Sequence, residues 1–132
     1  MVGPQLFRVL VEVGDLGRAS SFYASLLGVE GRPVQGGRVY FDCGSVIVGL
    51  LDVSLDGRAP RLVPEALYFA VDDLEGAFQR AQALACLAPD EVHGAPAGEI
   101  AVRPWGERSF YARDLDGNAL CFVDAGTRFT GR

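Results

Sequence analysis

The fold is recognised most readily from the segment Trp105-Gly-Glu-Arg-Ser-Phe-Tyr-Ala-Arg-Asp-Leu-Asp-Gly-Asn118. It contains a strand-like run that ends in the turn Asp116-Gly117-Asn118, and a second strand-like run follows at once over 119–123. Gly117 tolerates the positive φ that a short connection between twisted strands requires. The segment therefore predicts a β-hairpin, whose Asp and Asn residues serve first as turn residues that bind local backbone amides.

The chain around this segment consists of two related halves, which are clearest at their starts. The runs 6–16 and 65–74 are both extended, rich in β-branched and aromatic residues, and end at an aspartate followed by leucine. Apolar residues at helical spacing come after each run. They are Leu16, Ala19, Tyr23, Leu26 and Leu27 in the first half, and Leu74, Ala77, Phe78, Ala81 and Leu84 in the second.

Helix boundaries are marked by residues with known preferences. Gly28 stands where a helix C-terminus favours a residue that can take positive φ. Asp72 and Glu75 predict a capping pair at the start of the second helix, with acidic charge at the positive end of its dipole.

Strand patterns return after each helix, so the order β-α-β-β-β occurs twice. The expected strands are 32–34, 38–42 and 46–51 in the first half, then roughly 88–92, 108–113 and 119–123 in the second. The predicted fold is an α+β domain over 1–132, with modules at about 6–52 and 65–124 and a linker over 53–64.

Composition limits the possible functions. The chain has 132 residues, is 49% hydrophobic and carries a formal charge of −5, which argues against nucleic-acid binding. All twelve basic residues are arginine, so Schiff-base chemistry on lysine is excluded. No apolar run approaches the ~20 residues of a membrane span. The start shows no signal-peptide pattern and the three cysteines suggest no disulfide framework, so a cytoplasmic location is expected. The tail 125–132 is expected to fray.

The chain resembles the vicinal oxygen chelate superfamily, which includes glyoxalase I, extradiol dioxygenases and bleomycin-resistance proteins. The resemblance rests on the paired modules, on the Trp-Gly…Asp-Gly-Asn ending, and on an opening motif, and it covers about 6–124. The opening motif consists of Val13, Asp15, Leu16, Phe22 and Tyr23. The resemblance implies that each half curls its strands into a cup and that the cups enclose a ligand cavity. Because this fold hosts isomerases, dioxygenases, lyases and plain binders, it does not fix the function.

Metal-dependent members of this superfamily hold a divalent ion with His, Gln or Glu at four places, two per half. The corresponding positions here are Arg8 and Ala66 on the opening strands, Cys121 on the last strand, and the run 46–51, which has no ligating side chain. A guanidinium stays protonated and cannot ligate, and one thiolate is far from a stable site. His93, the only histidine, lies in a loop. We therefore expect no metal and no cofactor.

Strand alternation predicts which side chains line the cavity. Arg8, Leu10 and Glu12 should point inward, while the residues between them face the helix, and Ala66 and Tyr68 should be their counterparts in the second half. The predicted ligand-binding residues are Arg8, Glu12, Arg38, Tyr40, Tyr68, Trp105, Tyr111 and Cys121.

Each of these residues also has a purely structural interpretation. Arg8 could pair with Glu12 as an ion pair on one face of the strand. Tyr68 and Tyr111 could be packing residues, and Trp105 could stiffen its loop. Cys121 could be a small buried apolar side chain without a reactive role.

Two functions remain open. The first is a metal-free protein of the bleomycin-resistance type that sequesters a small aromatic or amphipathic ligand. The second is an enzyme, either a diverged lyase or isomerase with Glu12 as base, or a dioxygenase-like protein with unexpected ligands. A homodimer is expected, with the cavity built partly or wholly across the interface, because relatives usually cover their strand edges in this way.

Overall fold

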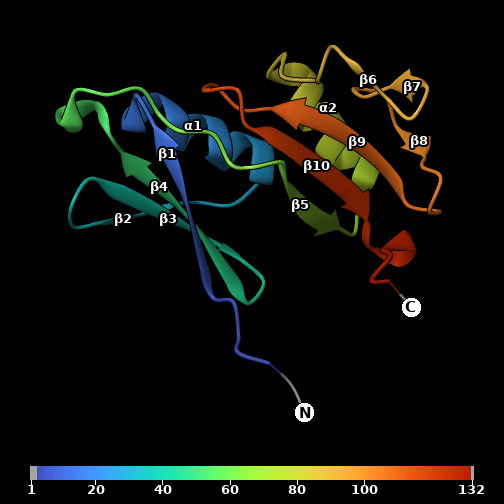
Figure 1. The fold of residues 1–132 in the computed structure, drawn as a ribbon, viewed down its shortest axis with the longest axis horizontal. Helices are drawn as coiled ribbons and strands as arrows, with labels where there is room; N and C mark the ends of the chain where they lie inside the picture. Colours follow the sequence, from blue (N-terminus) through green and yellow to red (C-terminus); the bar gives the residue numbers. More distant parts are fainter. Residues whose placement is uncertain (1–2, 132) are drawn as a thin grey trace. The chain divides into compact units, whose positions relative to one another are not determined.

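A computed structural model describes residues 3–131 of the chain. By its internal packing the chain divides into two compact units, one ending at Leu62 and the other beginning at Val63. Figure 1 traces both units in sequence colours. Each unit is described by itself below.

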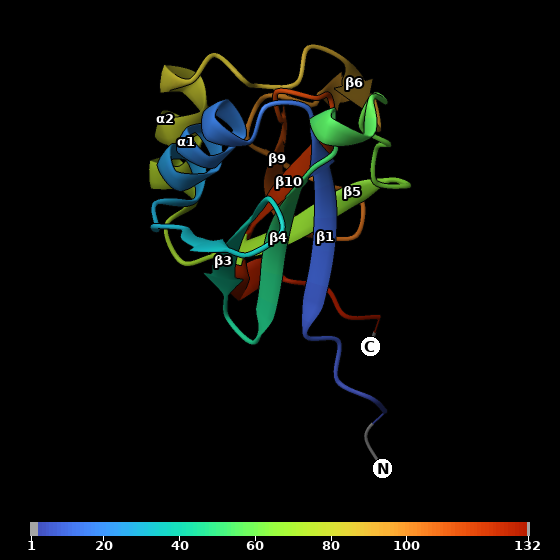
Figure 2. The same ribbon diagram turned by 90° about the vertical axis from the view of Figure 1, so that its left-hand side faces the viewer.

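The first unit is a four-stranded mixed sheet with one helix. Its elements are β1 (Arg8–Val13), α1 (Leu16–Leu27), β2 (Arg32–Val34), β3 (Arg38–Cys43), β4 (Val46–Asp52) and the short 3-10 helix η1 (Ser54–Asp56). The sheet order is β1-β4-β3-β2, with β1 parallel to β4 and the other pairs antiparallel. Figure 2 shows β1, β4 and β3 as neighbours, with α1 to one side of them.

The second unit repeats this plan. Its elements are β5 (Ala66–Val71), α2 (Leu74–Ala83), β6 (Glu91–Val92), β7 (Ala95–Pro96), β8 (Ala101–Val102), β9 (Arg108–Arg113), β10 (Ala119–Asp124) and the 3-10 helix η2 (Ala125–Thr127). The sheet order is β5-β10-β9-β8, with β5 parallel to β10. The predicted α+β class with two βαβββ modules is confirmed by these two mixed sheets and two helices.

The expected strand at 88–92 is wrong in its position. Only Glu91 and Val92 are strand there, and they pair with β7 in a separate hairpin that turns at His93 and Gly94, both with positive φ. The fourth strand of the main sheet is β8 instead. The run 88–92 contains few residues that favour strands, and the turn at 93–94 lets Glu91 and Val92 pair locally with β7, so its sequence did not reveal the strand partner.

Both helices are capped at their N-terminus by an aspartate. The Asp15 side chain accepts a hydrogen bond from the amide of Arg18 at 3.0 Å, and the Asp73 side chain accepts one from Gly76 at 2.9 Å. The second cap is therefore Asp73 and not the expected Asp72, because Asp73 is the residue just before the helix, with non-helical backbone at φ −120° and ψ 86°. At the other end of α1, Gly28 takes φ 71°, as expected.

Each sheet packs one face against its helix. In the first unit Val11 and Val13 are buried with Tyr23 and Leu26 of α1, and the Tyr23 ring also lies 6.1 Å from that of Phe41. The second unit has an aromatic core. Phe69, Phe122 and Phe110 stack in a row at 5.2 Å between successive ring centroids, and Phe78 of α2 meets Phe110 edge-on.

The Asp-Gly-Asn turn is held by its own side chains. Asp114 Oδ1 accepts hydrogen bonds from the amides of Asp116 and Asn118, and Gly117 takes φ 99°. Asn118 is buried and donates from Nδ2 to Asp114, while its Oδ1 accepts from the amide of Val63 at 2.7 Å. The predicted turn role is confirmed, and the same turn anchors the chain where the second unit begins.

The expected fraying of the tail is wrong for residues 125–129. The chain forms η2, and the amide of Arg108 donates to Thr127 Oγ1 at 3.0 Å. The amide of Phe129 donates to Glu107 Oε2 at 2.8 Å, which ties the tail to the loop before β9. Arg132 lies outside the described residues. No helix among those described is long and apolar enough to cross a membrane.

Candidate ligand-binding faces

Each sheet has a second face, directed away from its helix, and the predicted site residues lie mainly on these faces. On β1, Val11 and Val13 are buried toward α1, whereas Arg8 and Leu10 at the alternate positions are exposed. A Cβ placed on Gly49 of β4 would lie 2.7 Å from Leu10 Cδ2, so the two residues share this face. The alternation expected along β1 therefore agrees with the structure.

Arg8 lies over aromatic rings. Its guanidinium carbon is 5.0 Å from the ring centroid of Phe7 and 5.8 Å from that of Tyr40 on β3. Such contacts are weakly attractive because the ring face is electron-rich. Arg8 and Tyr40, two of the predicted site residues, are thus brought together. The interpretation that Arg8 pairs with Glu12 is wrong, since the Glu12 carboxylate is bound by different arginines.

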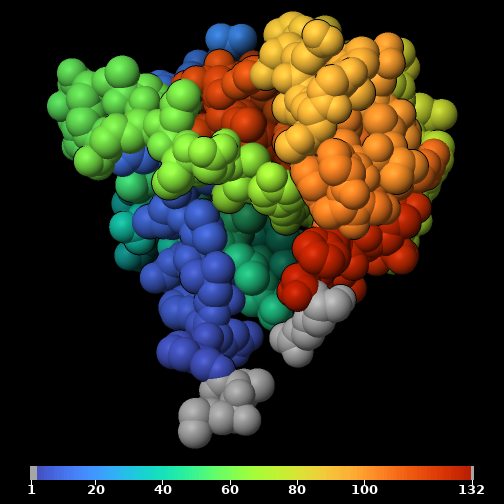
Figure 3. All heavy atoms as spheres, turned by 45° about the vertical axis from the view of Figure 1, so that its right-hand side comes forward, coloured from blue at the N-terminus to red at the C-terminus, as the bar shows by residue number. Residues whose placement is uncertain are grey.

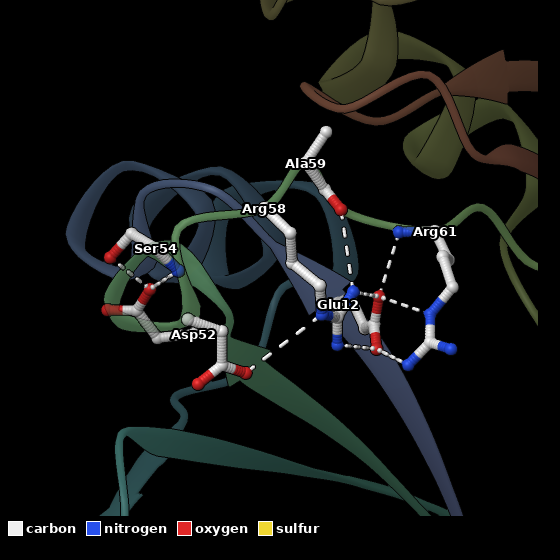
Figure 4. Close-up of polar contacts among 7 residues, drawn as sticks. Glu12, Asp52, Ser54, Arg58, Ala59 and Arg61 are labelled. Atoms are coloured by element: carbon white, nitrogen blue, oxygen red, sulfur yellow. Dashed lines mark hydrogen bonds and ion pairs between the residues drawn. The ribbon is translucent and has the colours of Figure 1, made fainter.

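Glu12 is held by two arginines that follow η1, as Figure 4 shows. Both of its carboxylate oxygens accept from Arg58, each at 2.7 Å. Arg61 donates from Nη2 at 2.9 Å, from Nε at 3.3 Å and from its backbone amide at 2.8 Å. These hydrogen bonds hold the pKa of Glu12 far below its usual range. A carboxylate so stabilised is a weak base.

Arg38 and Tyr40 lie on β3 at positions that share the face of Gly49. In the sheet register Arg38 pairs with Leu51 and Tyr40 with Gly49. Tyr40 is buried, and its ring Cε1 would lie 2.8 Å from a Cβ on Gly49. Arg38 Nε is buried without a hydrogen-bond partner among the described residues.

In the second unit, three predicted residues form a row across the sheet. Cys121 on β10 pairs in register with Tyr68 on β5 and with Tyr111 on β9. Burial raises the pKa of Tyr111 well above its usual range, and its hydrogen bonding to Tyr68 and Cys121 acts in the same direction. The hydroxyl therefore stays protonated and can donate a hydrogen bond.

Cys121 is a buried thiol without nucleophilic activation. Only 1% of its surface is exposed, and burial raises its pKa, an effect that hydrogen bonds with Ser109 and Tyr111 reduce in part. The thiolate is the reactive form of cysteine, so this thiol is unreactive at neutral pH. The apolar structural interpretation of Cys121 fits these surroundings.

Arg103 is a candidate residue that the sequence reasoning missed. It is only 3% exposed, and its guanidinium carbon lies 5.4 Å from the ring centroid of Tyr111. Its Nε donates to Ser109 Oγ at 3.0 Å, and its Nη2 donates to backbone carbonyls. Its Nη1 is buried without a partner among the described residues. The sequence carries no signal for it, because Arg103 stands in a loop outside both strand patterns.

Trp105 belongs to the loop before β9 and not to the row of Tyr68, Cys121 and Tyr111. Its Nε1 donates to Glu107 Oε1 at 2.7 Å, and its ring meets His93 edge-on at 4.8 Å. Because Glu107 also accepts the amide of Phe129, Trp105 is part of a network that fixes this loop. This supports the loop-stiffening interpretation.

The residues at the four family positions do not suit a divalent metal. Arg8 and Ala66 occupy equivalent places on β1 and β5, because they pair with Ile47 and Ala119 at matching points of the two sheets. The same register makes Gly49 the counterpart of Cys121. An arginine, a methyl group, a glycine and one thiol provide no set of three ligands. No group of three or more His, Cys, Asp or Glu residues within 3–131 could hold a metal ion.

Comparisons with known proteins add to this picture. A model of the Glyoxalase/Bleomycin resistance protein/Dioxygenase superfamily matches residues 5–122. No curated protein matches. The structure described as oxidase ChaP-H2 is 27% identical, with 98% of each chain covered and a TM-score of 0.75.

Two further solved structures share the fold. Oxidase ChaP-H1 is 24% identical with a TM-score of 0.77, over 98% of this chain and all of its own. Lactoylglutathione lyase from Agrobacterium tumefaciens is 24% identical with a TM-score of 0.65, over 92% of this chain and 94% of its own. Because the family model spans nearly the whole sequence, the chain belongs to the glyoxalase/bleomycin-resistance/dioxygenase superfamily.

Proposed function

We propose that this protein binds a small aromatic or amphipathic molecule without a metal, on the sheet faces directed away from the helices. The observation that carries the proposal is the donor set at the four family positions, where Arg8, Gly49, Ala66 and Cys121 replace metal ligands. A sheet face without metal-ligating side chains can still bind a small molecule through apolar area, aromatic rings and a few polar groups.

The character of the two faces supports such a ligand. The first carries Arg8 over Tyr40, with Leu10 beside them. The second carries Tyr68, 60% exposed, and Tyr111, which lie on either side of Cys121. Aromatic side chains offer large area at low entropic cost, and arginine recognises both rings and acidic groups. We therefore include the eight predicted residues in the proposal as ligand contacts or as supports for them.

Glu12 does not suit the role of catalytic base that a lyase or isomerase function would give it. Arg58 and Arg61 occupy its oxygens and keep it ionised, which lowers its proton affinity. A general base works best with a pKa near the working pH. We assign Glu12 instead to anchoring the segment after η1.

A second candidate is an oxygen-dependent enzyme, favoured by the 27% identity with a structure described as an oxidase. It requires a bound metal or an oxidisable ligand, so oxygen uptake with added aromatic substrates tests it directly. The binding proposal predicts uptake no faster than in buffer, with or without added Fe²⁺. Steady uptake that depends on the protein would favour the enzyme.

We further propose a homodimer located in the cytoplasm. The edge strands of the two sheets include β1 and β5, and unpaired edges favour association. Cys43, Cys86 and Cys121 are all free, which suits a reducing compartment.

The binding experiment compares wild-type protein with two variants, using 2-naphthamide as a neutral aromatic probe. Saturable binding should be measured by calorimetry and should remain unchanged after treatment with EDTA. Tyr68→Ala removes an exposed ring from the second face and should weaken binding several-fold, while Leu55→Ala, at a site 91% exposed outside both faces, should not. Absence of saturable binding, or its loss on chelation, would contradict the proposal.

A further inference from the structure

Arg103 is a buried cation that the described residues leave incompletely satisfied. None of the ion pairs among residues 3–131 includes it, although it is only 3% exposed. Its Nε and Nη2 donate to Ser109 and to the carbonyls of Ala97 and Glu99, but its Nη1 has no partner within the part of the chain that the structure describes. A buried charge is costly unless it is paired, so a free donor on it is the feature that needs an explanation.

The buried carboxylate of this loop is already engaged. Glu107 is buried, and its backbone carbonyl accepts from the amide of Arg103 at 2.7 Å. Its side chain, however, accepts from the Trp105 indole and from the amide of Phe129. The protein therefore uses this acid to fix the loop, and no carboxylate among the described residues forms an ion pair with the guanidinium.

The guanidinium belongs to the face that carries the row of Tyr68, Cys121 and Tyr111. It lies over the Tyr111 ring and donates a hydrogen bond to Ser109. Ser109 is next to Phe110 on β9, and because Phe110 faces the helix, Ser109 faces the other way. The Tyr111 hydroxyl stays protonated, since burial raises its pKa, and a ligand oxygen would take over its O–H from the hydrogen bonds that it shares with Tyr68 and Cys121. A planar oxygen anion would find here a guanidinium N–H and a phenol, donors that suit it well. Figure 3 shows the yellow and orange residues around 90–107 as a surface layer of the second unit.

We infer that the Arg103 patch, defined as Arg103, Ser109, Tyr111 and Tyr68, receives an anionic oxygen of the small molecule, a carboxylate or a phenolate. The inference rests on the proposed binding function and specifies the chemistry of the ligand: an aromatic body with one acidic group. It also assigns the anion to the second unit and not to Arg8, which is exposed and already lies against two rings.

The test uses a matched pair of probes, 2-naphthoate and 2-naphthamide, which differ in charge but hardly in shape. Wild-type protein should bind the naphthoate roughly 10- to 100-fold more tightly, as expected for one charge-assisted contact. Arg103→Met keeps an unbranched apolar stem and should remove most of this preference while leaving naphthamide affinity nearly unchanged. Arg108→Met is the matched control, because Arg108 is a partly exposed arginine of the same sheet that pairs with Glu75. It should leave the preference intact.

The outcomes distinguish the anion site from the binding function. Equal affinity for the two probes overturns the anion inference but leaves the binding function standing, whereas no binding of either probe overturns both. A preference that survives Arg103→Met, with only a lower melting temperature, shows that Arg103 merely braces its loop. Loss of the preference in Arg8→Met would place the anion in the first unit and would also overturn the inference.

Arg103 is buried, so Arg103→Met could fail to fold. In that case Tyr111→Phe, which removes only a hydroxyl, decides the matter together with Arg8→Met. A preference that falls several-fold in Tyr111→Phe and persists in Arg8→Met supports the Arg103 patch. The reverse pattern, or no change in Tyr111→Phe, contradicts it.

Discussion

Gly49 leaves room for two side chains that meet over it. A Cβ at this position would lie 2.7 Å from Leu10 and 2.8 Å from Tyr40. Leu10 is exposed and can move, but Tyr40 is buried, with only 8% of its surface exposed. The counterpart in the second unit, Cys121, has a side chain there, so the two modules differ at the position that faces the proposed ligand.

The first prediction concerns this position. Gly49→Ala should lower the free energy of unfolding by about 1–3 kcal/mol, because the buried ring must shift to admit a methyl group. Urea unfolding followed by circular dichroism measures it. Gly17→Ala is the control, since a Cβ there meets nothing closer than 3.7 Å and alanine favours the helix. Equal or higher stability of Gly49→Ala would show that Tyr40 is not fixed as described.

The second prediction concerns Glu12 and pH. Its pKa in the folded state lies far below the ordinary 4.5, so its ion pairs stabilise the protein fully above that value. The stabilisation declines as pH falls below about 4.5 toward the folded pKa. Glu12→Gln should therefore melt at a lower temperature than wild type at pH 7. This gap in melting temperature between wild type and variant should shrink on acidification. Glu30→Gln, at an exposed glutamate of the same unit, should show no gap. A gap that is constant with pH would contradict the ion-pair account.

Among the elements, the turn between β9 and β10 does more than reverse the chain. Asn118 Oδ1 accepts a hydrogen bond from the amide of Val63. The turn therefore fixes the segment that leads into β5 as well as β9 and β10. Strands β9 and β10 in turn place Tyr111 beside Cys121. The motif on which the family resemblance chiefly rests is thus a structural device.

The third prediction tests this device. Asn118→Ala should reduce the free energy of unfolding by about 1–3 kcal/mol. The Asp114 carboxylate and the Val63 amide would each lose the hydrogen bond that they form with the Asn118 side chain. Chemical denaturation gives the value. Leu115→Ala, in the same turn at a site 49% exposed, should change stability little. If both variants behave alike, the turn is not the anchor that we describe.

The fourth prediction concerns the assembly of complete chains: the protein should sediment as a homodimer at micromolar concentration. The sheets end in the edge strands β1 and β5, and Phe7 beside β1 is exposed. Sedimentation velocity over a range of concentrations measures the assembly. A single monomeric species throughout would refute the prediction.

Most of the fold could be predicted from local sequence. The helices, the strands 32–34 and 108–113, and the turn at Gly117 all lie where expected. Their signals come from residues a few positions apart, because helix periodicity, strand alternation and turn preferences are short-range effects. The same reasoning placed Arg8 and Leu10 on one face of β1, since alternation along a strand needs no knowledge of its neighbours.

The candidate site depends on contacts that form only when each unit has folded. Glu12 meets Arg58 and Arg61, which are 46 and 49 residues away, although the nearby Arg8 was the partner that spacing suggested. Arg103 shows no pattern in the sequence, and its buried Nη1 becomes visible only when Ser109 and Tyr111 surround it. Pairing of side chains distant in sequence follows from how strands register and loops close, and these are set by the packing of the whole unit. Short-range patterns were therefore enough to establish the two α+β modules, whereas the placement of charges on their faces required the folded units.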